Sequence, residues 1–301
     1  MKFLKPLLVC IVGATGIGKT ALSIKIAKAF STEIISADSR QFYKEMRIGT
    51  AVPSIKELAE VPHHFIQNKS IHDEYSVGNY EKEAISCIEN LFTKHAILVL
   101  VGGSGLYVDA IINSLDEFPK VDSSFREALN LQLKNLGIKS LQDELEKLDS
   151  DYFKTVDINN AHRLIRALEI CKGSGKPYSS FLKKQHITRS FNVLKIGITA
   201  ERELIYNRIN KRVDKMMDEG LLEEARNLHK YKALNALQTV GYKEMFDFFD
   251  DKISLEKAVE EIKKNTRRFA KRQGTWHRKD EEINWFDYKT KPTAIIDFIK
   301  K

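Results

Sequence analysis

The feature that most constrains this chain is a glycine-rich loop near its N-terminus, Gly13-Ala14-Thr15-Gly16-Ile17-Gly18-Lys19-Thr20. An apolar run, Leu7 to Val12, precedes the loop, and residues 19–30 follow it with apolar side chains at helical spacing. A strand, a G-x-x-x-x-G-K-T loop and a helix in this order are typical of a phosphate-binding P-loop. The pattern predicts an α/β protein with a P-loop NTPase-like core, in which helices flank a central parallel sheet.

The chemistry of such a loop follows from its backbone. Glycines let the amide N–H groups point inward around phosphate oxygens, and the helix N-terminus adds a partial positive charge. Lys19 is expected to reach the terminal phosphate, and the Thr20 hydroxyl is placed to ligate Mg²⁺. We therefore expect a diphosphate or triphosphate to be bound with Mg²⁺ by the whole loop, namely Gly13, Ala14, Thr15, Gly16, Ile17, Gly18, Lys19 and Thr20.

The position of the acidic residue near this loop is unusual. In ATP-hydrolysing P-loop proteins a second apolar strand usually ends in a carboxylate. Here the apolar run at 96–101 ends in Gly102-Gly103-Ser104-Gly105, and the carboxylate follows the strand predicted at 33–37, as Asp38. Since carboxyl ends of parallel strands meet at one edge of a sheet, we expect Asp38 beside the phosphates, where it can accept a proton from a nucleophile. A turn or N-cap aspartate is the alternative reading.

A long stretch between two predicted strands reads as helices. Apolar residues recur every four positions at Phe125, Leu129 and Leu133, while the strands are predicted at 96–101 and 193–199. We therefore expect a helical insertion within one catalytic core. The expected division is a core of residues 1–115 and 190–301, which includes basic C-terminal helices, and an insertion domain of residues 116–189.

One helix of this insertion carries arginines. It is expected to begin after Asn159 or Asn160, either of which is a good N-cap. Arg163 and Arg166 are three residues apart and share a face, whereas Leu164 lies on the opposite one. From the spacing alone, these arginines are either part of a solvated helix face or an RNA contact.

The positive charge of the chain, formally +8 at pH 7, is concentrated near the C-terminus. No acidic residue lies between Glu261 and Asp280, and a helix is predicted over 262–275. Closely spaced like charges repel each other unless a polyanion neutralises them, so we predict a helix that tracks phosphates. A solvated charged helix is the alternative. The basic residues are Lys263, Lys264, Arg267, Arg268, Lys271, Arg272, Arg278 and Lys279.

Composition excludes several other classes. The cysteines, Cys10, Cys87 and Cys171, form no C-x-x-C pair, which argues against a zinc site and a disulfide framework. His63 and His64 have no carboxylate or cysteine at ligand spacing, so a structural or RNA-facing role in a loop is expected. No apolar run is long enough to cross a membrane. We expect a cytoplasmic protein without a signal peptide, and a monomer.

Several further motifs, in order along the chain, resemble those of the tRNA dimethylallyltransferase family. With the P-loop they cover nearly the whole chain, and with no cysteine after Cys171 the sequence resembles the bacterial form, which lacks the eukaryotic zinc finger. The motifs are Asp38-Ser39-Arg40-Gln41, Gly49-Thr50-Ala51, Val61-Pro62-His63-His64, Gly102-Gly103-Ser104-Gly105-Leu106-Tyr107, Asn159-Asn160 with Arg163, Arg166-Ala167-Leu168-Glu169, Gly175-Lys176-Pro177, Arg212 to Leu222, Val240-Gly241-Tyr242-Lys243-Glu244 and Thr266 through Trp276.

The resemblance implies a reaction. A dimethylallyl group is transferred from dimethylallyl diphosphate to the exocyclic amine of the adenosine 3′ to the anticodon, in tRNAs that read codons beginning with U, and diphosphate is released. The P-loop then holds a leaving group, which agrees with the missing carboxylate after Val101. The partners implied are dimethylallyl diphosphate and the anticodon stem-loop of tRNA, with Mg²⁺ as cofactor.

Residue roles carried over from this resemblance are as follows. Asp38 is the general base, Thr15 and Arg212 are catalytic and contact the diphosphate, and Tyr107, Tyr242 and Trp276 are candidates to stack on bases. The residues implied to contact tRNA are Asp38, Ser39, Arg40, Gln41, Ser104, Arg126, His162, Arg163, Leu164, Ile165, Arg166, Gly241, Tyr242, Lys243, Arg267, Arg268, Lys271 and Arg272.

Three other functions compete with this one. An adenylate isopentenyltransferase would use free AMP or ATP as acceptor and would need neither the insertion nor the basic segment. A small-molecule P-loop kinase would transfer phosphate from ATP. An RNA-binding protein without catalysis would leave Lys19, Thr20 and Asp38 unexplained.

Overall fold

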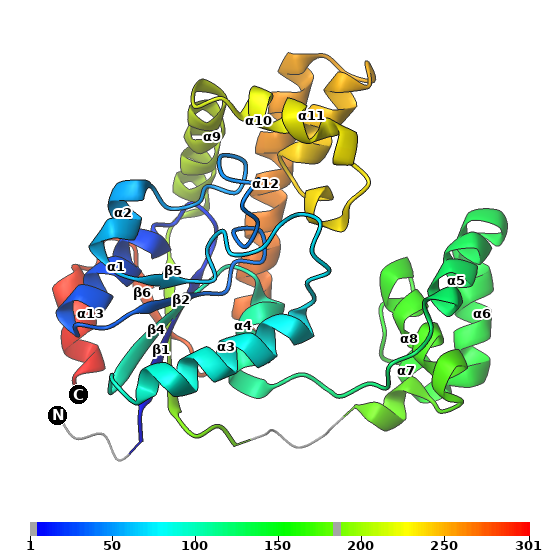
Figure 1. Ribbon diagram of the computed structural model, residues 1–301, viewed down its shortest axis with the longest axis horizontal. Coiled ribbons are helices and arrows are strands. Elements are labelled where there is room, and N and C mark those ends of the chain that lie inside the picture. Colours follow the sequence, from blue (N-terminus) through cyan, green and yellow to red (C-terminus); the bar gives the residue numbers. More distant parts are fainter. Residues whose placement is uncertain (1–4, 183–187) are drawn as a thin grey trace. The chain divides into compact units, whose positions relative to one another are not determined.

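The computed structural model describes residues 5–182 and 188–301 and divides the chain into two compact units (Figure 1). Unit 1 consists of residues 1–113 and 188–301, and unit 2 of residues 114–187. The expected insertion, 116–189, differs from unit 2 by two residues at each end, 116 against 114 and 189 against 187. Residues 1–4, and residues 183–187 of the expected insertion, lie outside the described part of the chain.

Unit 1 is built on a parallel sheet of six strands in the order β3-β2-β4-β1-β5-β6. The predicted central parallel sheet is therefore confirmed. In its middle, Val9 of β1 pairs with Val99 of β4 and Leu194 of β5. The strands are β1 Leu7–Gly13, β2 Ile34–Ser36, β3 His63–His64, β4 Ile97–Val101, β5 Asn192–Thr199 and β6 Asn284–Asp287.

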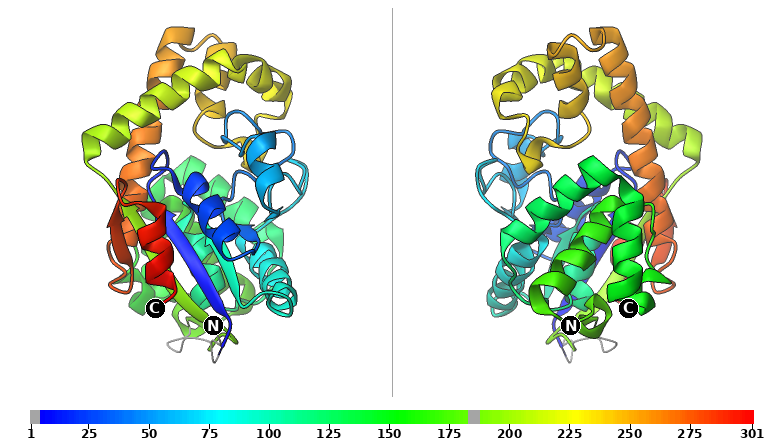
Figure 2. Two further views of the ribbon diagram at one scale, coloured as in Figure 1. Left: turned by 90° about the vertical axis from the view of Figure 1, so that its left-hand side faces the viewer. Right: turned by 90° about the vertical axis from the view of Figure 1, so that its right-hand side faces the viewer.

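Both faces of the sheet are covered by helices, which explains why every residue of β1 is buried. Alternate residues Leu7, Val9 and Ile11 pack in the cluster that contains helices α1 (Lys19–Ala29) and α13 (Pro292–Ile299). Figure 2 shows these two helices side by side over the sheet. The intervening residues of β1 pack on the other face, in the cluster that contains α3 (Val77–Phe92) and α4 (Gly105–Asn113).

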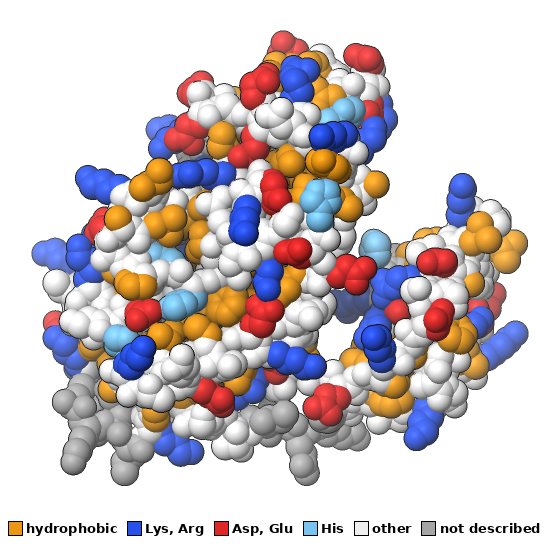
Figure 3. Space-filling model, in the orientation of Figure 1, with side chains coloured by type: hydrophobic (Ala, Val, Ile, Leu, Met, Phe, Trp, Pro, Cys, Tyr) orange, Lys and Arg blue, Asp and Glu red, His pale blue; other side chains and the backbone are white. Residues whose placement is uncertain are grey.

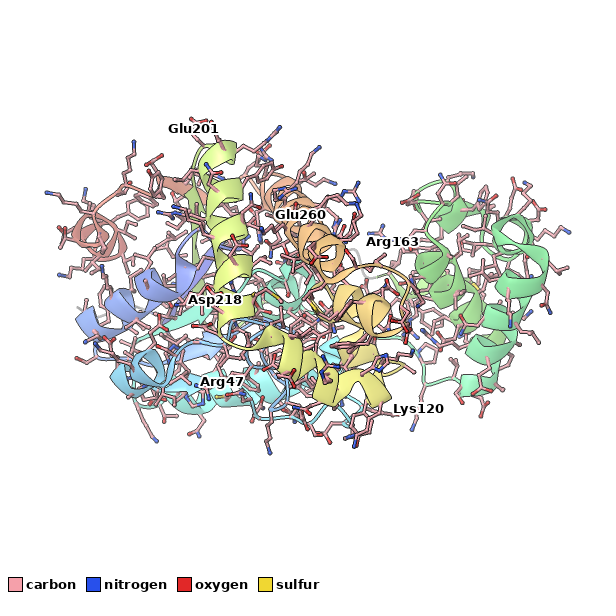
Figure 4. The ribbon with its side chains drawn as sticks, turned by 90° about the horizontal axis from the view of Figure 1, so that it is seen from above. Arg47, Lys120, Arg163, Glu201, Asp218 and Glu260 are labelled. Carbon is pink, nitrogen blue, oxygen red and sulfur yellow. The ribbon has the colours of Figure 1, made fainter. Side chains whose placement is uncertain are left out.

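The rest of unit 1 is a helical layer at the carboxyl end of the strands (Figure 1). The long helix α12 runs from Leu255 to His277 beside α9, and Figure 4 labels Glu201 and Asp218 next to the ends of α9 and Glu260 on α12. This layer has its own apolar core, in which Tyr242 and Met245 are fully buried. The other elements are α2 Ile55–Glu60, α9 Arg202–Asp218, α10 Leu221–Leu228, η2 His229–Tyr231, η3 Asn235–Leu237 and α11 Tyr242–Phe249.

Unit 2 is helical, with an apolar core in which Leu129, Leu141 and Leu168 are buried. Its longest helices pack on one another because each carries one apolar face. Of the two predicted N-cap candidates, Asn160 is the N-cap of α8, since its side chain accepts a hydrogen bond from the Arg163 amide at 3.3 Å. The helices are α5 Ser123–Leu136, α6 Ile138–Leu148, α7 Ser150–Phe153, α8 Ala161–Ser174 and η1 Tyr178–Phe181.

Two strands differ from the sequence prediction. The histidine pair was expected in a loop, but it forms the short edge strand β3, where His64 bonds the Glu33 carboxylate at 2.6 Å. Strand β6 was not predicted, because it has only four residues and its two apolar ones, Trp285 and Phe286, are adjacent and do not alternate with polar ones. Within residues 5–182 and 188–301, no cluster of His, Cys, Asp and Glu is arranged to hold a metal ion. None of the helices described there is long and apolar enough to span a bilayer.

Candidate active site

The P-loop joins the end of β1 to the start of α1 through glycines in conformations that other residues rarely adopt. Gly13 has a φ of 144°, and a Cβ there would lie 2.7 Å from the Ile198 carbonyl oxygen on the neighbouring strand. Gly18 has a φ of 107° and is the N-cap of α1. Close strand packing and a left-handed cap therefore require glycine at these two positions. The loop is bent so that its amides surround one side of a cavity.

Lys19 lies half-buried at the centre of this loop. Its ammonium donates to the carbonyl oxygens of Gly13 at 2.9 Å and Ala14 at 3.0 Å. The pKa of Lys19 is lowered to about 8, chiefly by burial; the Asp38 charge opposes this shift, and the Arg212 charge adds to it. An anion beside the ammonium would reverse this shift, because an opposite charge favours the protonated form. The geometry therefore suits a phosphate ligand.

Two cavities meet at this loop, and we name them by their linings. The P-loop chamber, of about 300 Å³, is polar and is lined by Thr15, Gly16, Gly18, Lys19, Thr20, Ser36, Asp38, Gln41, Ala51, Val101, Gly102, Gly103, Arg208 and Arg212. The apolar chamber, of about 380 Å³, includes the side chains of Leu106, Tyr107, Ile209, Val213, Met216, Val240, Ile262, Phe269 and Trp276. A chamber with fixed charges thus opens beside one with apolar walls.

Four residues line both chambers and mark the place where they meet: Thr15, Asp38, Gly103 and Arg212. The Arg212 guanidinium, on α9, donates to the Thr15 hydroxyl at 3.3 Å. Burial lowers the pKa of Arg212, while the Asp38 charge raises it. The expected catalytic residues Asp38, Thr15 and Arg212 are therefore brought together by β2, the P-loop and α9. Their roles in catalysis stay predictions.

Asp38 is held by the turn that follows β2. One of its carboxylate oxygens accepts from the Arg40 amide at 3.2 Å, and the Asp38 carbonyl accepts from the Gln41 amide at 3.1 Å. This is the turn geometry that sequence reasoning kept as an alternative. It does not compete with a catalytic role, because the same side chain lines both chambers.

The residues after Asp38 are each tied to another segment. The Ser39 and Ser104 hydroxyls lie 3.2 Å apart, and the Arg40 guanidinium donates to the Ala236 carbonyl at 3.0 Å. The Gln41 amide nitrogen donates to the carbonyl oxygens of Thr50 at 3.2 Å and Ala51 at 3.0 Å. The Arg40 bond ties this turn to η3 in the helical layer, and the other bonds tie it to the loop after β4 and to the loop that contains Thr50.

The basic helix α12 has the bounds 255–277, longer than the predicted 262–275. Lys263 pairs with Asp214 at 2.7 Å, Lys264 pairs with Glu261, and Arg267 bonds Asn210 at 2.7 Å. Arg268, Lys271 and Arg272 are exposed and have no ion-pair partner among the residues that the structure describes. On the face in Figure 3, charges of both signs are mixed, so that face shows no continuous basic surface.

In unit 2, two of the predicted RNA-contacting arginines share one buried carboxylate. Glu169, 6% exposed, accepts from Arg126 at 2.5 Å and from Arg166 at 3.3 Å. His162 and Arg163 are exposed in the first turn of α8. These side chains are accessible, and contact with tRNA stays a prediction for them.

Three of the residues predicted to contact tRNA have buried side chains in this structure, and contact with tRNA stays a prediction for them. Leu164 and Ile165 are buried in the core of unit 2, at 0% and 3% exposure. Tyr242 is fully buried, and its hydroxyl donates to Glu224 at 2.6 Å, so its ring cannot stack on a base. Its neighbour Gly241 is also buried but lines the apolar chamber, while Lys243 is exposed. The motif Val240 to Glu244 therefore reaches the apolar chamber through Val240 and Gly241, whereas Tyr242 packs in the core of the helical layer.

Sequence reasoning assigned no role to Gln273, which the structure places at the meeting point of the chambers. It accepts from the Thr15 amide at 2.9 Å and donates to the Gly103 carbonyl at 2.7 Å. Arg208 was also missed; it lines the P-loop chamber and donates to the Ile17 carbonyl at 3.1 Å. The one available signal for Gln273 was its helical spacing from Phe269 and Trp276, which line the apolar chamber with it.

Known proteins similar to this chain agree with the geometry. A family model described as IPP transferase matches residues 41–280. Proteins named tRNA dimethylallyltransferase from Christiangramia forsetii and Flavobacterium psychrophilum are 60% and 53% identical, and each match covers 97% of both chains. The crystal structure of the tRNA isopentenylpyrophosphate transferase from Bacillus halodurans has a TM-score of 0.73 at 38% identity and covers 98% of this chain and 96% of that one.

A more distant structure extends the likeness. A eukaryotic dimethylallyltransferase acting on tRNA has a TM-score of 0.82 at 27% identity, and the match covers 98% of this chain and 80% of the other. The matches to the two solved structures cover 98% of this chain, whereas the family model begins at residue 41, after the P-loop and Asp38. With a family model over most of the sequence and relatives of this identity over nearly its full length, the chain belongs to the tRNA dimethylallyltransferase family of IPP transferases.

Proposed function

We propose that this protein transfers a dimethylallyl group from dimethylallyl diphosphate to the exocyclic amine of the adenosine 3′ to the anticodon, in tRNAs that read codons beginning with U. The relatives named above are called tRNA dimethylallyltransferases, which supports transfer of a dimethylallyl group to tRNA, and the chambers are suited to an allylic diphosphate. In the reaction the allylic C–O bond breaks, a C–N bond forms, and diphosphate leaves with the electron pair of the C–O bond. The proton of the amine must be accepted by a base.

The observation that carries the proposal is the meeting of a polar and an apolar chamber at Asp38 and Arg212. An allylic diphosphate has a dianionic or trianionic end and a hydrocarbon end, so it needs both environments at once. The hydrocarbon end can pack against aliphatic walls such as Val213 and Met216 of the apolar chamber while the diphosphate end lies in the P-loop chamber. The chambers therefore favour an isoprenoid diphosphate.

The departing diphosphate is the group whose charge must be stabilised. The allylic carbon becomes cationic as its C–O bond lengthens, so preorganised positive charge on the leaving oxygens lowers the barrier. Lys19, Arg212 and the loop amides supply that charge in this chamber. Within the described residues the Thr20 hydroxyl has no hydrogen-bond partner and lines the same chamber, so it suits Mg²⁺ ligation. Bound Mg²⁺ would neutralise further charge on the diphosphate.

Asp38 is the residue placed to act on the nucleophile. An exocyclic amine on adenine is a poor nucleophile, and loss of its proton as the bond forms raises its reactivity. Asp38 reaches both chambers, so it can accept that proton while Arg212 faces the leaving group. The adenine must leave its stack to enter the apolar chamber, which exposed side chains such as Trp276 and Phe269 would favour.

The proposal assigns RNA contacts to exposed cations on α12 and α8, among them Arg268 and Arg163. It also places the protein in the cytoplasm, where tRNA is found, and has it act as a monomer. The RNA contacts are proposed from the positions of the exposed charges, and the cytoplasm from the location of the tRNA substrate.

Incubation with radiolabelled dimethylallyl diphosphate and Mg²⁺ tests the proposal. Label should appear in tRNA, and digestion to nucleosides should place it on one adenosine. A tRNA in which guanosine replaces the adenosine 3′ to the anticodon is the matched control and should stay unlabelled. Prenylation of AMP but not of tRNA would contradict the proposal, as would transfer of γ-phosphate from ATP to an acceptor.

A further inference from the structure

Gln273 connects the basic helix to the phosphate loop through its side-chain amide. The residue is 7% exposed, and its amide bonds two different loops, as acceptor from Thr15 N–H at 2.9 Å and as donor to Gly103 C=O at 2.7 Å. The packing is tight, because a Cβ at Gly103 would overlap the Gln273 amide. The side-chain oxygen and the side-chain nitrogen of Gln273 each make a hydrogen bond, so the orientation of the amide group is fixed.

The bond to Thr15 changes what the P-loop can offer a ligand. P-loops bind phosphate oxygens through backbone amides, so an amide that is bonded within the protein is withdrawn from that task. Of the loop amides from Thr15 to Thr20, that of Thr15 is taken by Gln273 and that of Ile17 donates to Ala14 at 3.3 Å. Those of Gly16, Gly18, Lys19 and Thr20 have no backbone partner among the described residues.

The position of Gln273 shows which side of the loop is affected. Thr15 and Gly103 line both chambers, whereas Gln273 lines only the apolar one. Its amide therefore lies where a phosphate chain longer than the P-loop chamber would extend into the apolar chamber. The Thr15 hydroxyl is engaged as well, since it accepts from Arg212 at 3.3 Å. The amide N–H and the hydroxyl of Thr15 are thus both hydrogen-bonded to side chains, those of Gln273 and Arg212, where the two chambers meet.

We propose that Gln273 is a specificity-determining residue, which restricts the P-loop chamber to a diphosphate. It does so because its hydrogen bond to the Thr15 amide makes that amide unavailable to the third phosphate of a nucleoside triphosphate. The inference rests on the proposed function in one respect, that the ligand of this chamber is a diphosphate. It accounts for a P-loop that has the full G-x-x-x-x-G-K-T motif and yet lies beside an apolar chamber.

The test compares the binding of inorganic diphosphate and inorganic triphosphate, each with Mg²⁺, to the full chain by titration calorimetry. Gln273→Met keeps the volume of the side chain and removes both hydrogen bonds. The freed Thr15 amide should bond the longer ligand, so affinity for triphosphate relative to diphosphate should rise about tenfold, as one added charge-assisted hydrogen bond implies. Asn265→Leu is the matched control, because it removes an amide bond of 2.8 Å to Glu244 from the same helix outside both chambers, and its ratio should stay unchanged.

A second variant separates specificity from simple packing. Gln273→Glu keeps an acceptor for the Thr15 amide and adds negative charge, so both ligands should bind more weakly without a rise in the ratio. Equal weakening of both ligands in Gln273→Met would overturn the inference, and so would an unchanged ratio or a raised ratio in Gln273→Glu. If Gln273→Met does not fold, Gln273→Asn is too short to reach Thr15 and should show the same rise.

The outcome is distinguishable from that of the proposed function. The calorimetric ratio needs neither RNA nor prenyl transfer, so a chain that prenylates no tRNA can still show the rise in Gln273→Met. Conversely, tRNA prenylation by the unaltered chain together with a constant ratio would reject the role of Gln273 alone.

Discussion

A single carboxylate on α10 joins the helical layer to the loop that lines the apolar chamber, and its removal should be costly. Glu224 accepts from the backbone amides of Arg47 at 3.0 Å, Ile48 at 2.8 Å and Gly49 at 2.9 Å, and from the Tyr242 hydroxyl at 2.6 Å. Figure 4 labels Arg47 at this loop. We expect Glu224→Ala to leave these four donors without their acceptor.

The magnitude follows from the burial of each donor. Arg47 is exposed, so water can replace the carboxylate at its amide, whereas Ile48 and Gly49 are half-buried and Tyr242 is fully buried. Each buried donor left unsatisfied costs about 1 to 3 kcal/mol, and partial hydration places the two loop amides near the lower limit. Glu224→Ala should therefore lower the free energy of unfolding by about 3 kcal/mol. Tyr242→Phe should cost only about 1 kcal/mol, since it removes the donor together with its bond.

Urea unfolding followed by tryptophan fluorescence measures this loss in unit 1 alone, because both tryptophans, Trp276 and Trp285, lie there. The double variant of Glu224→Ala with Tyr242→Phe should lose about 2 kcal/mol less than the sum of the single losses, because only the two loop amides are then left without an acceptor. Glu223→Ala, exposed on the same helix, is the matched control and should change stability by less than about 0.5 kcal/mol. A loss below about 1 kcal/mol in Glu224→Ala, or strictly additive losses, would refute the reasoning.

Three further predictions concern the ligands. Asp38→Asn should keep tRNA affinity but lower kcat by roughly 10² to 10⁴, and a near-normal kcat in single-turnover assays would exclude Asp38 as the base. The pKa of Lys19 is lowered to about 8, chiefly by burial, and a bound diphosphate should raise it. The affinity for diphosphate should therefore be highest below pH 8, where Lys19 is charged without a ligand, and should fall as the pH rises above 8. Lys19→Arg stays charged and should remove this dependence in calorimetry from pH 7 to 9.5. Replacement of Arg268, Lys271 and Arg272 by glutamine should flatten the salt dependence of tRNA binding by about 2 in log–log slope, and an unchanged slope would place the RNA elsewhere.

Much of the site was predictable because its chemistry is local in sequence. The P-loop needs only consecutive residues, since the glycines and the start of α1 fix the positions of Lys19 and Thr20. Asp38 was predictable for a related reason: in a parallel sheet the carboxyl ends of neighbouring strands lie at one edge, whatever the intervening chain does. Neither prediction depends on the precise ends of the helices and strands, so small errors in those ends did not affect them.

The unpredicted parts depend on contacts between distant segments. Gln273 and Thr15 are 258 residues apart, and Glu224 and Gly49 are 175 apart, so no periodicity in either segment reports the pair. Tyr242 was misjudged because an aromatic residue inside a motif has the same sequence signature whether it lines a cavity or fills a core. The contact with Gly49 shows that Tyr242 fills a core, since a Cβ at Gly49 would lie 2.6 Å from the Tyr242 ring. The buried Tyr242 ring thus requires glycine at position 49.

Helix α12 explains why its basic segment contains a buried glutamine. Its 23 residues form one rod, and residues separated by about one or two helical turns, such as Phe269, Gln273 and Trp276, line the apolar chamber, while Arg268 and Lys271 are exposed. The bond from Gln273 to Thr15 is 2.9 Å long, and an N–H···O bond is lost near 3.5 Å, so a shift of α12 by about 0.6 Å along that bond would free the Thr15 amide. The exposed cations and the bond to the phosphate loop therefore belong to the same helix, so an RNA contact that displaces α12 by this distance along that bond would also free the Thr15 amide.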